Sequence, residues 1–321
     1  MPHIHNVARN SLRVDPTRTG LIRKQFQAEI LRRLKAIRDD VREFLVELDA
    51  LGLDSISGAG NPSGLLGPSR GIKIGLSEGS NSRPTIHARP QPREFQFRTS
   101  AAKLKAFRDW LQDQIEARVF IPEGGTLGKP WTAKYIESAY KRGRFSAFAK
   151  AKGKQAIFEP GFTEKEAEMF MKAFTSSERT SKIELLATRA LEELRGVTSV
   201  MAQKMNRVLA TGMAEGRGAT SIAREISTEV KGISKTRALM IARTETINAH
   251  AEGTLDAFKE LGVEDVGLMA EWSTAGDSRV CPQCSAMEGK KFSLKEARGL
   301  IPAHPNCRCA WIPFVPTRGN K

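Results

Sequence analysis

Apolar side chains recur every three or four residues over most of the chain, a spacing typical of amphipathic helices. The first such stretch covers residues 15–50, where Asp15 is a capping residue and Pro16 follows at the first helical position. The most regular stretch is 181–212. Further helices are predicted at 101–118, at 131–152, at 163–174, from Thr220 through Ile226, and at 234–260 with Ser234 as a cap. These patterns predict a mainly α-helical body.

The helical pattern is interrupted once and then ends. Residues 56–93 are crowded with Gly, Ser, Pro and Asn and predict a flexible linker, after which 94–98 alternate as in one strand. Beyond Gly262, short β-type stretches are predicted at 269–273, 290–292 and 309–315. The predicted fold class is therefore mainly α, a helical body with a small α+β, Cys/His-rich C-terminal unit.

The same changes of pattern predict the domain organisation. Residues 1–55 would form an N-terminal amphipathic helical region, 56–93 the flexible linker, 94–178 a basic helical domain, and 179–321 the domain that ends in the cysteine-rich unit. A chain of 321 residues has room for two or three domains. No run approaches the ~18 apolar residues that a membrane span needs, so no membrane partner is expected.

The positive charge is concentrated in one part of the chain. The formal net charge is +15, and residues 59–158 carry 18 Lys and Arg against 7 Asp and Glu, so that +11 lies there. Such a stretch favours a polyanionic partner, most plausibly the phosphates of nucleic acid, bound without sequence preference. The alternative is a solvated helical surface that keeps the protein soluble.

All four cysteines lie close to the C-terminus, together with one histidine. Two Cys/His knuckles with this spacing are typical of a tetrahedral Zn²⁺ site. There are five candidates for four ligand positions: the expected set is Cys281, Cys284 and Cys307, completed by either His304 or Cys309. A closed, thiolate-rich site is structural rather than catalytic, because catalysis requires an open coordination position.

Two other states of these thiols are compatible with the sequence. They can be buried free cysteines that pack as small apolar groups, or they can form two disulfides. Nothing at residues 1–5 resembles a signal peptide, so an oxidising compartment is not indicated.

Several separated motifs in this part of the chain resemble one protein family. They are Ile241-Ala242-Arg243-Thr244-Glu245, Trp272, Asp277-x-Arg279-Val280-Cys281-x-x-Cys284, Gly289-Lys290 and His304-Pro305-Asn306-Cys307-Arg308-Cys309. In this order and spacing they resemble the phage Mu F-like head morphogenesis proteins, the minor head proteins of tailed phages and prophages. The resemblance covers residues 180–315 and marks 179–321 as the Mu F-like domain.

The resemblance implies a structural protein, not an enzyme, located in the virion head or procapsid and in the host cytoplasm during assembly. Its expected partners are the portal protein, capsid subunits and phage DNA, with roles in capsid assembly and in DNA packaging or retention. It also favours a structural polar network that locks a helix to the C-terminal unit, made of Arg243, Glu245, Asn248, Asp277 and Arg279. The alternative for these residues is ordinary surface charge.

Two other functional classes remain as alternatives. A metal-dependent nuclease or toxin-like effector carried with the phage head would need a general base and an open metal position. The histidines available are His304 and His250, and the nearest acids are Asp277 and Glu288, without a carboxylate cluster. A zinc-containing DNA-binding regulator would need a recognition helix, for which 295–300 is short. No small-molecule substrate is indicated.

Overall fold

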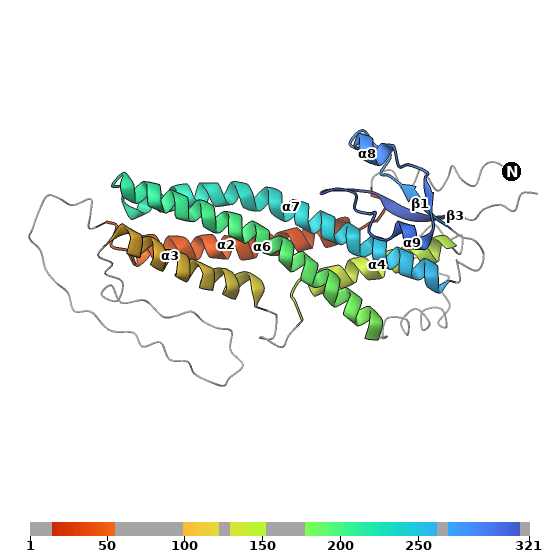
Figure 1. Cartoon of the computed structure of the whole chain (residues 1–321), viewed down its shortest axis with the longest axis horizontal. Coiled ribbons are helices and arrows are strands. Elements are labelled where there is room, and N and C mark those ends of the chain that lie inside the picture. Colours follow the sequence, from red (N-terminus) through yellow and green to blue (C-terminus); the bar gives the residue numbers. More distant parts are fainter. Residues whose placement is uncertain (1–14, 55–98, 122–128, 152–176, 262–268, 315–321) are drawn as a thin grey trace, which may run out of the picture. The chain divides into compact units, whose positions relative to one another are not determined.

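The computed structural model describes residues 15–54, 99–121, 129–151, 177–261 and 269–314 (Figure 1). These residues form long helices and one small sheet, which confirms the predicted fold class. None of the helices within these ranges combines the length and apolarity needed to cross a membrane. The helices are α2 (Gly20–Arg42), α3 (Ser100–Ile115), α4 (Ala133–Ala151), α6 (Ser177–Ala214), α7 (Ala219–Glu260), α8 (Pro282–Ser285) and α9 (Leu294–Ala297), and the strands are β1 (Met269–Ser273), β2 (Lys291–Phe292) and β3 (Ala310–Phe314).

Three predicted elements lie outside the described residues: the linker at 56–93, the strand at 94–98 and the helix at 163–174. The predicted start of the first helix was wrong, because α2 begins at Gly20. The Asp15 carboxylate instead accepts hydrogen bonds from the Thr17 N–H (3.2 Å) and hydroxyl (2.7 Å). These bonds close a turn ahead of the helix, as Asp side chains commonly do.

The predicted break at Ser234 was also wrong, since α7 runs through it without interruption. The Ser234 hydroxyl is buried and donates to the Val230 carbonyl at 2.7 Å, one helical turn earlier. A serine that bonds back to the preceding turn continues a helix instead of capping it. The real break lies between α6 and α7, where Gly216 has φ +69° and the Arg217 N–H donates to the Gly212 carbonyl at 2.8 Å. This is the C-terminal turn for which glycine is favoured.

The chain divides into two compact lobes. Lobe 1 comprises Met1–Ile30, Ile121–Arg195 and Thr236–Lys321, and lobe 2 comprises Leu31–Phe120 and Gly196–Lys235. The domain boundaries expected from the sequence stay a prediction.

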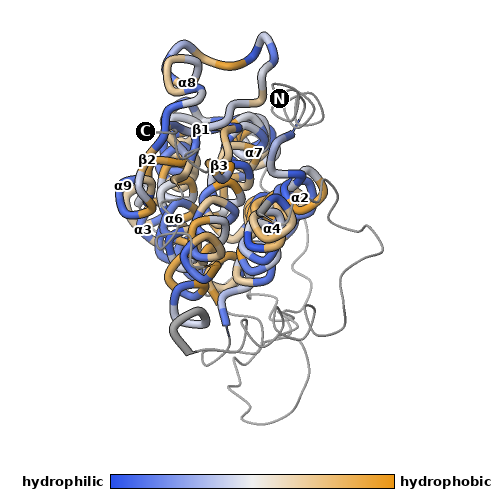
Figure 2. Tube along the Cα trace, turned by 90° about the vertical axis from the view of Figure 1, so that its right-hand side faces the viewer, coloured by the Kyte–Doolittle hydropathy of each residue, from blue (hydrophilic) through white to orange (hydrophobic). Residues whose placement is uncertain are grey.

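Lobe 2 is built from the second part of α2, α3, the end of α6 and the start of α7. π-helical turns at Glu43–Glu47 and Glu116–Phe120 extend α2 and α3. The Phe44 ring stacks on Trp110 with centroids 4.1 Å apart. Hydrophobic and polar residues alternate along the helix tubes (Figure 2), as expected for helices that each bury one face.

Lobe 1 contains a close contact between α4 and α7. Adding a Cβ to Gly143 would place it 2.0 Å from the His250 carbonyl oxygen, and a Cβ on Gly253 would lie 2.2 Å from that of Tyr140. The Thr254 hydroxyl lies between the two backbones, 3.2 Å from the Gly143 carbonyl and 2.9 Å from that of His250. The two helices can approach this closely only because both contact positions lack a side chain.

The sheet of lobe 1 has the strand order β2-β1-β3 with both pairs antiparallel. Trp272 of β1 is paired with Trp311 of β3, and their rings meet edge to face at 5.4 Å. Both indoles are buried in one hydrophobic core with side chains of α7 and the thiols of Cys284, Cys307 and Cys309. The sheet therefore fixes the cysteine-bearing loops against the long helix.

Candidate metal centre and polar network

The first cysteine knuckle is formed at the start of α8. Cys281 is the residue before the helix and Pro282 occupies its first turn. The Cys281 sulfur accepts a hydrogen bond from the Cys284 N–H at 3.4 Å. This bond lowers the pKa of the Cys281 thiol. The local sequence thus turns both sulfurs toward the same side and favours the thiolate that a metal requires.

The second knuckle is a tight turn over residues 304–307. The Cys307 N–H donates to the His304 carbonyl at 3.1 Å, and Asn306 has φ +65°. Asparagine adopts this left-handed conformation more readily than most residues. The Asn306 N–H donates to the Thr244 hydroxyl of α7 at 3.1 Å, which anchors the turn to the long helix.

The two knuckles bring their side chains together. The His304 Nε2 atom lies 3.2 Å from the Cys281 sulfur and 3.1 Å from the Cys284 sulfur. The sulfurs of Cys284 and Cys307 are 3.9 Å apart. In a tetrahedral zinc site, bonds of about 2.3 Å to sulfur and 2.0 Å to nitrogen put neighbouring sulfurs about 3.8 Å apart and nitrogen about 3.5 Å from sulfur. The observed spacing is close enough to hold a metal ion.

Cys284 occupies the centre of this arrangement. Cys281, Cys284 and His304 form one group with all ligand atoms within 4.8 Å, and Cys284, Cys307 and Cys309 form a second. Cys284 is the residue that the two groups share. Burial, together with the negative charge of Cys307, raises the pKa of the Cys284 thiol to about 12. A bound cation would stabilise its thiolate there.

The surroundings of His304 bear on the choice between His304 and Cys309 as the fourth ligand. The His304 Nδ1 atom lies 2.8 Å from the Pro305 carbonyl oxygen. A carbonyl can only accept, so Nδ1 carries a proton, and in the neutral ring the Nε2 lone pair is then the one that can bind a metal. Metal-binding histidines are commonly oriented by such a bond from the other ring nitrogen. Cys309 is buried and belongs to the second group, with Cys284 and Cys307.

The five residues expected to form the polar network lie in two places. Asp277 accepts two hydrogen bonds from Arg308 (2.5 and 2.7 Å) and is paired with Arg279 at 2.8 Å. The hydrogen bonds from Arg308 and Arg279 lower the pKa of Asp277. Because Arg308 lies between Cys307 and Cys309, this cluster ties the second knuckle to the loop that follows β1.

The other three network residues lie along α7. Glu245 is buried and its carboxylate lies 3.4 Å from the Arg189 guanidinium of α6. The side-chain nitrogens Arg243 Nε and Asn248 Nδ2 are buried without a hydrogen-bond partner among the described residues. His250 is buried too, and burial, with the nearby charge of Lys150, lowers its pKa to about 3. An enclosed imidazole with so low a pKa is too weak a base, and too inaccessible, for general-base catalysis near neutral pH.

A second set of ion pairs, not anticipated from the sequence, connects α7 to the C-terminal unit. Arg298, which follows α9, donates to Glu252 at 2.8 Å and to Asp256 at 2.6 Å. Lys182 of α6 is paired with the same two carboxylates at 2.8 and 2.7 Å, and the Tyr140 hydroxyl donates to Asp256 at 2.6 Å. Burial alone would raise the pKa of Asp256, but the hydrogen bonds from Lys182 and Tyr140 outweigh it and lower the pKa. The available sequence signal was the four-residue spacing of the two acids, which places both on one helix face.

Replacing Glu245 with glutamine is expected to stabilise the protein at high pH. Burial raises the pKa of Glu245 to about 7, against the opposing effect of Arg189. Below the unfolded pKa, near 4.5, both states hold the proton, whereas between about 4.5 and 7 only the folded state does. Stability therefore falls as the pH rises through this window. Glu245→Gln should remove that fall and raise the free energy of unfolding by on the order of 2–3 kcal/mol at pH 8, with little change at pH 4.

Urea denaturation of both proteins between pH 4 and 8 measures this difference. The matched control is Glu184→Gln, an exposed acid on the same helix as Arg189, which should leave the pH dependence of stability unchanged. An equal pH dependence in wild type and Glu245→Gln would show that the Glu245 carboxyl titrates as it does in the unfolded chain.

The basic stretch 59–158 is described only in part, over residues 99–121 and 129–151. Its aromatic rings there are largely packed inside the protein: Trp131 and Tyr140 are buried, and Phe26 of α2 stacks on Tyr135 at 4.8 Å. These rings belong to the core and are not presented for stacking on bases.

Comparison with known proteins gives one match. Residues 203–312 match the family model described as phage Mu protein F like protein. This confirms the resemblance noted in the sequence, and the matched segment contains all four thiols and the whole of α7. Comparison with curated proteins and with solved structures returns no match.

Proposed function

Because residues 203–312 form a phage Mu protein F like segment, we propose that this protein is a minor head protein that acts structurally in phage head morphogenesis. The family match is the observation that carries the proposal. It supports a place in the virion head or procapsid and an interaction with other head components. In this proposal the immediate partners are the portal protein and capsid subunits, and the packaged DNA is contacted without sequence preference.

The proposed role of the cysteines is to hold one structural Zn²⁺. The proposed ligands are Cys281, Cys284, Cys307 and His304, and Cys309 packs beside them. A small sheet of twelve residues buries little surface by itself, so a metal staple would contribute much of the stability of the C-terminal unit. The support is the donor set and its spacing, together with the orientation of His304 by Pro305.

The polar residues are proposed to hold this unit on the long helix. The proposed network is the one that the resemblance favours: Asp277, Arg279, Arg243, Glu245 and Asn248. The ion pairs from Arg298 to Glu252 and Asp256 of α7 add to this network, because they also connect the C-terminal unit to the long helix. In this proposal the C-terminal unit is a rigid surface that contacts other proteins of the head.

Co-expression tests the proposed partner. The full chain would be produced together with the portal protein of the phage or prophage that encodes it, with the affinity tag on the portal protein alone. Co-purification at a fixed stoichiometry is expected, and it should be lost when residues 203–312 are deleted. A portal protein that purifies without the chain, at a salt concentration where both are folded, would contradict the portal association.

A plasmid cleavage assay separates this proposal from the nuclease alternative. With added Zn²⁺ or Mg²⁺, a structural protein leaves supercoiled DNA intact. Cleavage that disappears in His304→Ala would favour the nuclease. The short distances from His304 Nε2 to the two sulfurs support a role for His304 as a metal ligand and not as a free general base.

A further inference from the structure

Lobe 2 contains an open recess between α2 and α7 with a volume of about 450 Å³. Its lining is entirely polar and mostly basic: Arg38, Asp39 and Arg42 come from α2, and Ser227, Thr228 and Lys231 from α7. Three cations face one carboxylate, so the recess has a local excess of positive charge. Among the residues that the structure describes, no aromatic or aliphatic side chain lines it, in contrast to the mostly apolar pockets that bind small organic molecules.

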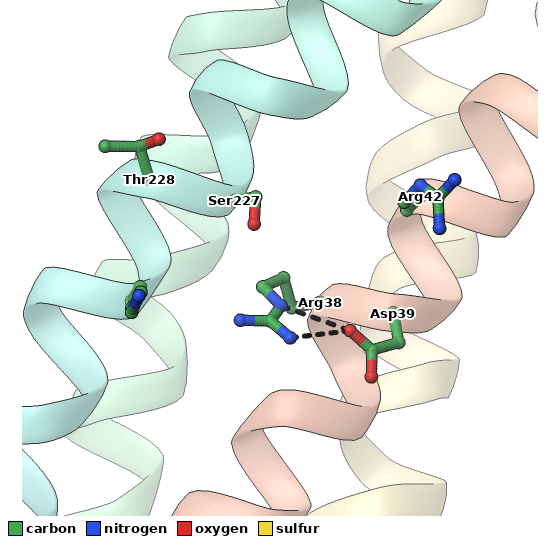
Figure 3. Close-up of a pocket in the computed structure, with 6 residues that line it drawn as sticks. Arg38, Asp39, Arg42, Ser227 and Thr228 are labelled. Carbon is green, nitrogen blue, oxygen red and sulfur yellow. Dashed lines mark hydrogen bonds and ion pairs between the residues drawn. The ribbon is translucent and has the colours of Figure 1, made fainter.

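Helical spacing explains why these side chains converge. Arg38 and Arg42 are four residues apart and lie on one face of α2, about 6 Å apart along the axis. Ser227 and Lys231 have the same separation on α7. Figure 3 shows Arg38 extending from α2 toward α7, with Ser227 on the opposite wall. The result is two facing rows of hydrogen-bond donors, one on α2 and one on α7.

The arginines are partly held in place but remain available. Arg38 donates through Nε (3.1 Å) and Nη2 (2.8 Å) to one oxygen of Asp39, which leaves its Nη1 group outside this pair. Arg42 approaches Glu47 only to 3.8 Å, and its side chain is 67% exposed. A guanidinium held by one neighbour presents its remaining N–H groups in a fixed direction, which suits phosphate oxygens.

We propose that this recess binds the phosphate backbone of double-stranded DNA through Arg38, Arg42 and Lys231. The inference deepens the proposed function, since it assigns the DNA contact of a head protein to a defined site. Guanidinium, ammonium and hydroxyl groups are the usual partners of phosphate oxygens, and they carry no base information. The absence of stacking groups from the recess makes the contact one to the backbone, independent of sequence.

The test is the affinity of the full chain for a 30-base-pair duplex of arbitrary sequence, measured by fluorescence anisotropy from 50 to 200 mM NaCl. The double variant Arg38→Gln/Arg42→Gln is compared with Arg108→Gln/Arg207→Gln, which removes the same charge from two exposed arginines of α3 and α6. Loss of two phosphate contacts should lower the affinity about tenfold at 100 mM NaCl and reduce the slope of log K against log salt by about 2. The control pair should change the affinity by less than about twofold.

Lys231→Gln supplies an independent variant on the other wall of the recess and should reduce the slope by about 1. Equal affinities for the recess and control variants would overturn the inference. So would a wild-type chain that fails to bind the duplex. A wild-type chain that binds poly-glutamate more tightly than the duplex would also overturn it. Each of these results leaves the co-purification with the portal protein as a separate measurement, so the proposed function can stand when this inference fails.

Discussion

Replacing Cys284 with serine is expected to abolish metal binding and to disorder the C-terminal unit. Cys284 belongs to both groups of candidate ligands, so neither group is complete without it. Structural zinc contributes an apparent 10–16 kcal/mol, on the order of the whole stability of a domain. The wild-type chain should contain about one zinc per molecule by elemental analysis, and Cys284→Ser none.

Tryptophan fluorescence would show whether the loss of metal disorders the C-terminal unit in particular. Trp272 and Trp311 share a buried core with Cys284, so loss of the metal should expose both indoles and shift their fluorescence to longer wavelength. The far-ultraviolet circular dichroism should change much less, because most of the helical residues lie outside the unit. Wild-type protein that keeps its tryptophan emission and its melting temperature after removal of zinc by a chelator would contradict the structural role of the metal.

The pair His304→Ala and Cys309→Ser identifies the fourth ligand. If His304 binds through Nε2, its removal lowers the zinc affinity severely, whereas Cys309→Ser keeps one zinc per chain and costs only some core packing. The opposite pattern would assign the fourth position to Cys309. Both variants keep the three shared candidates Cys281, Cys284 and Cys307 and differ only in which residue remains for the fourth position, so a difference in zinc stoichiometry identifies the fourth ligand.

Periodicity was sufficient to predict the long elements. The spacing of apolar residues in 181–212 and 101–118 reflects helices that bury one face. The first stretch lies within α6, and the second is covered by α3 together with the π-helical turn Glu116–Phe120. The three strands predicted beyond Gly262 have bounds within one residue of those of β1, β2 and β3. The cysteine spacing also predicted a Cys/His cluster close enough to hold a metal, because two residues between ligands restrict each knuckle to one turn. Which four residues bind the metal stays a prediction.

Local pattern could not predict interactions that depend on tertiary contacts. Ser234 resembles a cap in sequence, but its environment against Met201 of α6 buries the hydroxyl and keeps it bonded within the helix. The partners of Asp256 come from positions 74 and 116 residues earlier and 42 residues later in the chain. Nothing in the local sequence identifies Lys182, Tyr140 or Arg298 as those partners.

Replacing Gly253 with alanine is expected to destabilise lobe 1 by about 3 kcal/mol or more. The new Cβ would lie 2.2 Å from the Tyr140 carbonyl oxygen, a backbone atom that no change of rotamer can move. The helices α4 and α7 would have to separate, with loss of the packing around Gly143 and of the Thr254 hydrogen bond to it. Thermal and urea denaturation followed by circular dichroism measure the loss.

Two other helical glycines are matched controls for this effect. A Cβ at Gly196 of α6 or Gly232 of α7 would meet nothing within 4 Å. Alanine at either position should therefore stabilise the protein by about 0.5–1 kcal/mol, because alanine is the better helix former. A Gly253→Ala protein as stable as these controls would show that α4 and α7 do not approach as closely as the structure has them.

The double variant Gly143→Ala/Gly253→Ala tests whether the two glycines serve one contact. Each would place a methyl group against the backbone of the other helix, at the His250 and Tyr140 carbonyls. Once the helices have separated to accommodate the first methyl group, the second meets less resistance. The combined loss should thus be smaller than the sum of the single losses by 1 kcal/mol or more, on the scale of coupling between residues in contact, about 0.5–3 kcal/mol. Additive losses would mean that α4 and α7 relax independently at the two positions, and that the closeness of the pair is not a single packed interface.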